Sequence, residues 1–262
     1  MSSTLDIQRH GTVAQVWLNR PEVRNAFNDS VIAELTAAFR ELGSDASLRV
    51  IVLGGRGKAF CAGGDLNWMR AMADYSWEQN RADAQALADM LWTLYTCPLP
   101  LVGRVHGDCY AGGVGLAAVC DVLVAAEGMH FCLSEAKLGL LPATIGPYVV
   151  RALGEQASRR YFISAERFSA AEAYRLGFVH ELAPADSIDA KVDAIVQALV
   201  ANGPAAVKAS KTLVRDLAGQ PLTPELRADT ARRIADIRAS DEGREGVQSF
   251  LNKRAPGWQA ER

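Results

Sequence analysis

The sequence predicts a mixed α/β protein that ends in a helical region. Two observations predict this fold class. Short apolar runs in the first half of the chain have the length of buried strands, and each lies beside glycines or a stretch of helical spacing. After about residue 150 the strand signal fades and helical spacing dominates. We therefore expect an α/β part over residues 1–200 and a helical part over residues 201–262. The predicted strands are residues 13–18, 50–53, 101–105 and 121–126.

The predicted helices carry capping residues at their ends. Asn28 is a good N-cap for a helix whose apolar residues recur at positions 32, 35, 39 and 42. Ser169 and Glu172 have the spacing of a capping box, and Gly177 fits the position just beyond that helix. Three further helices are expected from apolar stripes in residues 79–95, 188–199 and 224–239.

Composition excludes several classes of function. The 262 residues are 49% hydrophobic and 22% charged, with a formal net charge of −2, so nothing in the overall charge favours nucleic acid. The five cysteines form no CxxC pair and the four histidines lack ligand spacing, so we expect free thiols and no metal site. Without a leader pattern at residues 1–13 or an apolar run of about 20 residues, a cytoplasmic protein that does not bind membranes is expected.

Two glycine-containing segments each follow a predicted strand. In residues 58–66 (KAFCAGGDL), small residues allow close approach of a ligand to the backbone, and Asp65 can cap a following helix. Residues 103–116 (GRVHGDCYAGGVGL) offer a second group of N–H donors at a helix start. Two convergent N–H groups would hold an oxyanion. The alternatives are a tight turn in the first segment and a closely packed helix in the second, without a ligand in either.

A third segment, residues 130–142 (HFCLSEAKLGLLP), places Glu135 among apolar and small residues. Burial would raise the pKa of this carboxyl and suit it to proton transfer near neutral pH. The alternative is a capping or salt-bridged glutamate, with Lys137 as a candidate partner.

Taken in order, these segments resemble the enoyl-CoA hydratase/isomerase (crotonase) superfamily over nearly the whole chain. In the first half of the chain, the motifs that carry the resemblance are LNRP at 18–21, Arg-Asn-Ala at 24–26, AFCAGGDL at 59–66, GG at 112–113 and CD at 120–121. In the second half they are Glu135 with LG at 138–139 and Pro142, residues 166–177, and FLNKRAPGW at 250–258.

The resemblance implies a ββα spiral core and a C-terminal helical region that mediates homotrimers or homohexamers. It implies that Gly64 and Gly112 donate the two oxyanion N–H groups and that Glu135 is the catalytic carboxyl. Coenzyme A would enter as part of an acyl-CoA substrate, with no separate cofactor. The residues implied to contact coenzyme A are Val23, Arg24, Ala62, Asp65, Leu66, Phe250 and Lys253.

One departure from the family pattern is important. Two-glutamate hydratases have their first glutamate three residues after the oxyanion glycine, where this chain has Gly115. Dienoyl isomerases have aspartates at the positions of Gly115 and Ala143, and both are absent here. Residues 141–150 (LPATIGPYVV) also differ from the usual glycine-rich form.

One branch of the family is indicated by four features together: glycine in place of the first glutamate, CLSE at 132–135, PYVV at 147–150 and DLNWM at 65–69. This combination is similar to bacterial methylglutaconyl-CoA hydratases of leucine and isovalerate metabolism. We therefore expect hydration or dehydration of a 3-methylglutaconyl-CoA-like thioester. A Δ3,Δ2-enoyl-CoA isomerase that uses Glu135 alone and a catalytically degenerate binding protein stay as alternatives. Asp108 and Tyr110 are candidate pocket residues, with a structural role in the loop as the alternative. Arg56, Arg70 and Lys137 are candidates to pair a substrate carboxylate, although a solvated surface charge is the simpler reading.

Overall fold

The computed structural model describes residues 4–259 of a chain that divides into two compact units, residues 1–194 and 195–262. The first unit is a mixed α/β structure and the second is helical, so the predicted fold class is confirmed. The division falls inside helix α8 (Ile188–Ala201), close to the expected boundary at residue 200.

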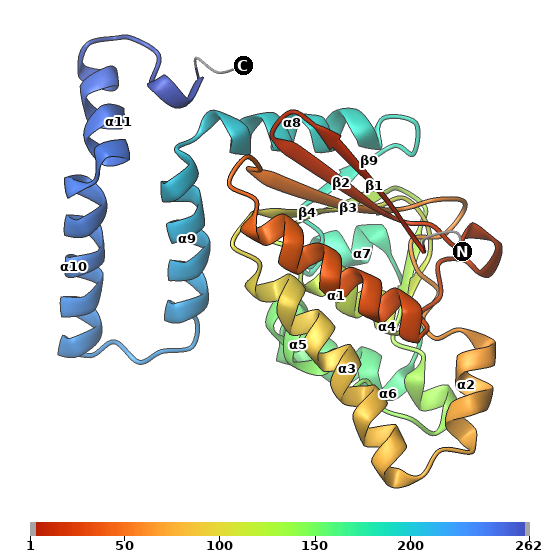
Figure 1. Cartoon of the computed structure of the whole chain (residues 1–262). Helices are drawn as coiled ribbons and strands as arrows, with labels where there is room; N and C mark the ends of the chain where they lie inside the picture. Colours follow the sequence, from red (N-terminus) through yellow and green to blue (C-terminus); the bar gives the residue numbers. More distant parts are fainter. Residues whose placement is uncertain (1–3, 260–262) are drawn as a thin grey trace. The chain divides into compact units, whose positions relative to one another are not determined.

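A six-stranded sheet forms the centre of the first unit, in the order β1-β2-β3-β4-β6-β9 (Figure 1). β1 pairs antiparallel with β2, and every other neighbouring pair is parallel. Parallel pairs need crossover connections, and the helices between the strands supply them. The strands are β1 (Leu5–His10), β2 (Val13–Leu18), β3 (Val50–Gly55), β4 (Leu101–Val105), β6 (Val122–Ala126) and β9 (Glu181–Ala183).

A smaller sheet of three strands holds β5 (Cys109–Tyr110), β7 (His130–Cys132) and β8 (Arg167–Ser169), in that order. β5 runs parallel to β7, and β8 runs antiparallel to it. The expectation that strands fade after residue 150 is therefore wrong for β8 and β9. Strands of two or three residues are too short to show an alternating pattern, so periodicity could not reveal them.

Helix α1 (Asp29–Ser44) begins where the sequence predicts. The Asn28 side chain accepts a hydrogen bond from the Val31 N–H at 3.0 Å, and α1 buries Leu35 and Phe39 while packing against α3 (Trp77–Thr96). The other helices and 3₁₀ turns of the first unit are η1 (Pro21–Val23), α2 (Leu66–Ala73), α4 (Gly112–Ala118), η2 (Glu135–Leu138), α5 (Gly146–Leu153), α6 (Glu155–Ser164) and α7 (Ala170–Arg175).

The predicted N-cap and the glycine after the end of α7 are confirmed, but the reciprocal bond of the capping box is not formed. Ser169 accepts a hydrogen bond from the Glu172 N–H at 3.1 Å, and Gly177, with φ of 78°, follows the end of the helix. The Glu172 carboxylate pairs with Arg175 at 2.7 Å, so it does not complete the box by bonding back to the Ser169 backbone.

The second unit contains α9 (Pro204–Leu217), α10 (Pro224–Ala239), α11 (Asp241–Leu251) and η3 (Gly257–Gln259). The Glu242 carboxylate of α11 accepts hydrogen bonds from the Ala205 and Ala206 N–H groups of α9, and Arg233 of α10 pairs with Asp216 of α9. α9 and α10, both inside the described residues, have no buried residue of their own. Across residues 4–259, no helix combines the length and the apolar character needed to cross a membrane.

Candidate active site

The two glycine segments of the sequence lie against each other in the folded chain. Cys61 and Cys109 form a parallel bridge, and the Tyr110 N–H donates to the Cys61 carbonyl at 2.9 Å. A Cβ atom added to Gly63 would lie 2.9 Å from the Cβ of Ala111. Gly63 and Ala111 each precede one of the two predicted donors, Gly64 and Gly112. The fold therefore brings the two donor positions together from separate loops.

Both predicted donor N–H groups are available for a ligand. Within residues 4–259, neither the Gly64 N–H nor the Gly112 N–H donates a hydrogen bond to the protein. Gly112 is the first residue of α4, where a backbone N–H has no acceptor within the helix. Both glycines are partly exposed. Two such amides on adjoining loops can stabilise negative charge on one oxygen.

Phe27, which the sequence analysis did not single out, positions both glycines. Its N–H donates to the Gly63 carbonyl at 2.7 Å, and its own carbonyl accepts from the Asp65 N–H at 2.7 Å. Its ring lies so close to Gly112 that a Cβ there would be 2.7 Å from it. Phe27 directly follows the Arg-Asn-Ala motif at 24–26. Its place beside that motif was the one sequence feature that could have pointed to it.

Asp65 and Arg20 fasten the first glycine segment. The Asp65 carboxylate caps α2 through the Asn67 N–H at 2.8 Å and pairs with the Arg20 guanidinium at 2.8 Å. Its side chain is 7% exposed, and although burial opposes ionisation, the bonds from Arg20 and the α2 backbone hold its pKa below the ordinary value. The carboxylate is thus committed to holding the loop. Asn25, also buried, bonds the Arg56 and Ala59 carbonyls just before that loop.

Glu135 lies in η2, three residues after β7. The Ala111 N–H donates to the Cys132 carbonyl at 2.8 Å, and this bond ties the Glu135 segment to the second glycine segment. Burial raises the pKa of the Glu135 carboxyl. Its Oε2 atom is buried and has no hydrogen-bond partner among the described residues. Lys137 is exposed and does not contribute to the shift of the Glu135 pKa, so the salt-bridged alternative is not favoured.

Asp108 and Tyr110 are bonded to each other. The Tyr110 hydroxyl donates to the Asp108 carboxylate at 2.6 Å, and burial together with this bond raises the Tyr110 pKa to about 12. The same carboxylate accepts from the His130 N–H at 3.3 Å and lies 3.6 Å from Arg167. These contacts link β5, β7 and β8, and they favour the structural role that the sequence left open.

The residues expected to contact coenzyme A fall into two groups. Near the glycine loops, the Ala62 N–H donates to the Arg24 carbonyl at 3.0 Å, Arg24 has a left-handed backbone (φ 54°), and Val23 and Leu66 are exposed. Phe250 and Lys253 lie in the second unit, at and just beyond the end of α11, and Phe250 is 83% exposed. Ala143 is exposed on the loop before α5. Their roles toward coenzyme A stay predictions.

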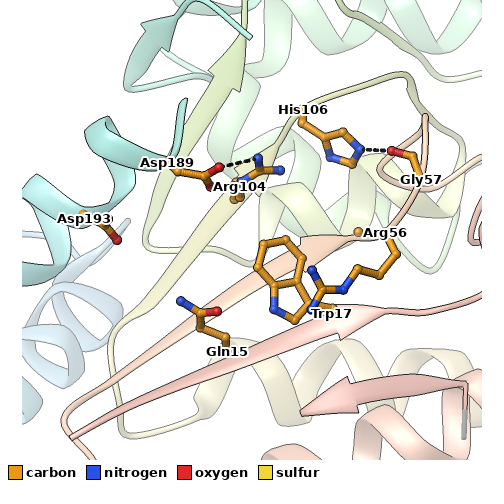
Figure 2. A pocket seen from close by; sticks show the side chains of 9 residues that line it. Gln15, Trp17, Arg56, Gly57, Arg104, His106, Asp189 and Asp193 are labelled. Atoms are coloured by element: carbon orange, nitrogen blue, oxygen red, sulfur yellow. Dashed lines mark hydrogen bonds and ion pairs between the residues drawn. The ribbon is translucent and has the colours of Figure 1, made fainter. Parts of the chain in front are cut away.

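A separate polar pocket of about 410 Å³ lies over β2, β3 and β4 (Figure 2). It contains Arg56, which pairs with Asp6 and stacks on Trp17, and Arg104, which pairs with Asp189. Neither the two donor glycines nor Glu135 line it. Arg56 is thus paired with Asp6, and Arg70 donates a hydrogen bond to the Asn67 side chain at 2.5 Å. A role for Arg56 or Arg70 toward a substrate carboxylate stays a prediction.

The cysteines are all free thiols, as expected, and burial raises the pKa of Cys61 to about 12. Residues 4–259 contain no cluster of three His, Cys, Asp or Glu side chains able to hold a metal ion.

The chain is similar to known proteins over nearly its whole length. The family model for enoyl-CoA hydratase/isomerase matches residues 8–261. The 2,3-dehydroadipyl-CoA hydratase of Escherichia coli is 31% identical over 97% of this chain and 98% of its own length. The crystal structure of an enoyl-CoA hydratase from Shewanella pealeana has a TM-score of 0.94 at 39% identity, covering 97% and 96% of the two chains. Pseudomonas aeruginosa AtuE has a TM-score of 0.93 at 36% identity, covering 97% and 99%. The chain belongs to the enoyl-CoA hydratase/isomerase family.

Proposed function

We propose that this enzyme adds water reversibly to a 2-enoyl-CoA thioester, with Gly64 and Gly112 holding the thioester oxygen and Glu135 transferring the proton. The observation that carries the proposal is the pair of available N–H groups on adjoining loops. Charge that develops on an oxygen between two fixed dipoles is stabilised without reorganisation of the site.

The proton balance needs only one carboxyl group. Ionised Glu135 accepts a proton from water while the water oxygen bonds to the β-carbon, and electrons move to the thioester oxygen to form an enolate. The same carboxyl then gives the proton to the α-carbon as the carbonyl re-forms. Its raised pKa, caused by burial, matches a group that must both accept and return a proton.

The substrate is proposed to be a glutaconyl-type thioester such as 3-methylglutaconyl-CoA. Gly115 in place of the first glutamate, the segment 141–150 and the run DLNWM at 65–69 support this branch of the family. The named relatives include a hydratase of a different dicarboxylic acyl group, 2,3-dehydroadipyl-CoA. A substrate comparison is therefore the decisive measurement.

Hydration is followed by the loss of enoyl-thioester absorbance with crotonyl-CoA and with 3-methylglutaconyl-CoA. We expect faster turnover of 3-methylglutaconyl-CoA, and a loss of about 10²–10⁴-fold in kcat for Glu135→Gln, because the amide cannot transfer the proton. Glu127→Gln, on the loop after β6, is the matched control and should keep full rate. Full activity in Glu135→Gln would contradict the role of Glu135, and preference for crotonyl-CoA would contradict the branch.

A second candidate activity is Δ3,Δ2-enoyl-CoA isomerisation. The observation that favours it is the single carboxyl group, because moving a proton between two carbons needs no second acid. Incubation with a 3-enoyl-CoA thioester distinguishes the two activities. Conversion to the 2-enoyl isomer at a rate above hydration would make the isomerase the principal activity.

We further propose that the protein assembles as a homotrimer or a pair of trimers through its second unit. The support is that α9 and α10, described in full, bury none of their residues. Their apolar side chains, which include Val214 and Ile234, therefore need a surface beyond these two helices.

A further inference from the structure

Gly115 lies on α4 with no room for a side chain. A Cβ atom on Gly115 would be 2.8 Å from the Cβ of Ile145 and nearer still to its Cγ2, whereas real Cβ contacts essentially never fall below 3.0 Å. The next nearest atom, Cδ2 of Leu91, would be at 3.6 Å, an ordinary contact. Of the three atoms nearest to such a Cβ, only the two of Ile145 would clash with it.

Ile145 is not free to move aside. It is 2% exposed and lies immediately before α5, which packs against α4. Its carbonyl accepts hydrogen bonds from the Tyr148 and Val149 N–H groups, each at 3.0 Å, so the first turn of α5 holds its backbone. Its branched Cβ also restricts the side chain at χ1. The clash would have to be relieved by moving a helix.

On the basis of the proposed function, we propose that Ile145 determines the chemistry of this site by filling the place of a second acid, which restricts the enzyme to one carboxyl group. This chain has no side chain at position 115, and Ile145 fills the adjacent space. Ile145 lies in the segment 141–150, which differs from the usual glycine-rich form. We therefore expect the sizes of the residues at positions 115 and 145 to be coupled, so that a larger residue at one requires a smaller residue at the other.

The chemical consequence follows from the nature of the surface. Ile145 and Leu91 are fully buried hydrocarbon groups and cannot orient water or donate a proton. Proton transfer then falls to Glu135 alone. The pH profile of kcat/KM should accordingly show one ionisation from the active-site carboxyl, where a two-acid hydratase shows two.

Unfolding tests the packing without any need for activity. Gly115→Ala, Ile145→Gly and the double variant are compared by the midpoint of urea unfolding. We expect Gly115→Ala to lower the midpoint in the wild-type background, and to lower it much less in the Ile145→Gly background. Gly146→Ala is the control, because its added Cβ would contact only Phe162, at 3.8 Å. We expect this variant to keep the wild-type midpoint of urea unfolding. Equal losses in both backgrounds would overturn the coupling.

Kinetics test the chemistry. Gly115→Glu is compared with the double variant Gly115→Glu/Ile145→Gly. The double variant Gly115→Gln/Ile145→Gly is the control, because glutamine has the size of glutamate but cannot transfer protons. We expect the glutamate double variant to hydrate crotonyl-CoA at least about tenfold faster than Gly115→Glu alone and than the glutamine control. It should also add a second ionisation to the pH profile of kcat/KM.

The outcomes separate this inference from the proposed function. Equal rates for the glutamate and glutamine double variants, or a Gly115→Glu single variant as active as the double, would overturn the assignment of Ile145. A wild-type enzyme without hydratase activity contradicts the proposed function instead, and the unfolding comparison then still decides whether positions 115 and 145 are coupled.

Discussion

At the scale of single residues, the sequence predicts the type of group at each position of the site better than it predicts its partners. Glu135 was expected to be buried with a raised pKa; the structure shows the raised pKa, but the residue is half-buried and only its Oε2 atom is fully covered. Asp65 was expected to cap a following helix, and its carboxylate does cap α2, while its contact with coenzyme A stays a prediction. The sequence did not predict that the same carboxylate pairs with Arg20. That pairing joins residues 45 positions apart, so no local pattern could reveal it.

The half-buried carboxyl of Glu135 should lower stability near neutral pH. Because its pKa is raised in the folded state, the folded protein binds this proton more tightly than the unfolded chain does. Its contribution is therefore most favourable below the unfolded pKa of about 4.3, and it is lost as pH rises through the folded pKa. We expect Glu135→Gln to raise the urea midpoint at pH 8, with a smaller gain as pH falls toward 4. A gain that does not depend on pH would contradict this account.

Gly63 should be sensitive to the addition of a single methyl group. Its φ of 92° disfavours a side chain, and a Cβ would meet both Ala111 and the Tyr110 carbonyl. Gly63→Ala should push the two glycine loops apart and lower kcat/KM by about 10²-fold, comparable to the loss of one oxyanion donor. Gly128→Ala has similar backbone strain at φ 81°, with no atom within 4 Å of the new Cβ. If this control loses as much activity, then strain explains the effect and loop contact does not.

At the scale of elements, long periodic helices and apolar strands could be predicted, and short strands could not. The helix at residues 224–239 has the bounds of α10, and Asn28 caps α1 as expected. β5, β8 and β9 depend on tertiary pairing, so their own residues carry too little signal. β5 illustrates the consequence for the site, because its pairing with β7 brings the Glu135 segment to the second glycine segment.

The N-cap of α1 should matter for stability more than for catalysis. Asn28 satisfies the Val31 N–H and directly follows Phe27, which contacts both glycine segments. Asn28→Ala should lower the free energy of unfolding by about 1 kcal/mol, as measured by urea titration. Ser30→Ala, at an exposed position in the first turn of α1, is the control and should change stability by less than about 0.5 kcal/mol. Equal losses in the two variants would contradict the capping role.

At the scale of the whole molecule, the α/β core followed by helices could be predicted from periodicity, and the spiral arrangement came from the resemblance. The mutual placement of residues 61–64 and 109–113 could not be derived from local pattern, because it depends on a long-range bridge between Cys61 and Cys109. The close approach of positions 115 and 145 depends on the packing of α4 against α5, which no local pattern predicts. The unusual segment 141–150 gave the only local sign of it.

Assembly is a prediction that belongs to this largest scale. α9 and α10 expose apolar side chains such as Val214 and Ile234, and a charge placed there would be buried unpaired if the surface is an interface. Light scattering after gel filtration should give about three or six times 28.2 kDa for the wild type. Ile234→Asp should weaken assembly by at least about 100-fold and shift the mass toward that of one chain, whereas Ile234→Leu, which keeps an apolar surface, should not. A wild type that stays monomeric at tens of micromolar would contradict the proposed trimer, and an Ile234→Asp variant that stays assembled would place the interface on a different surface.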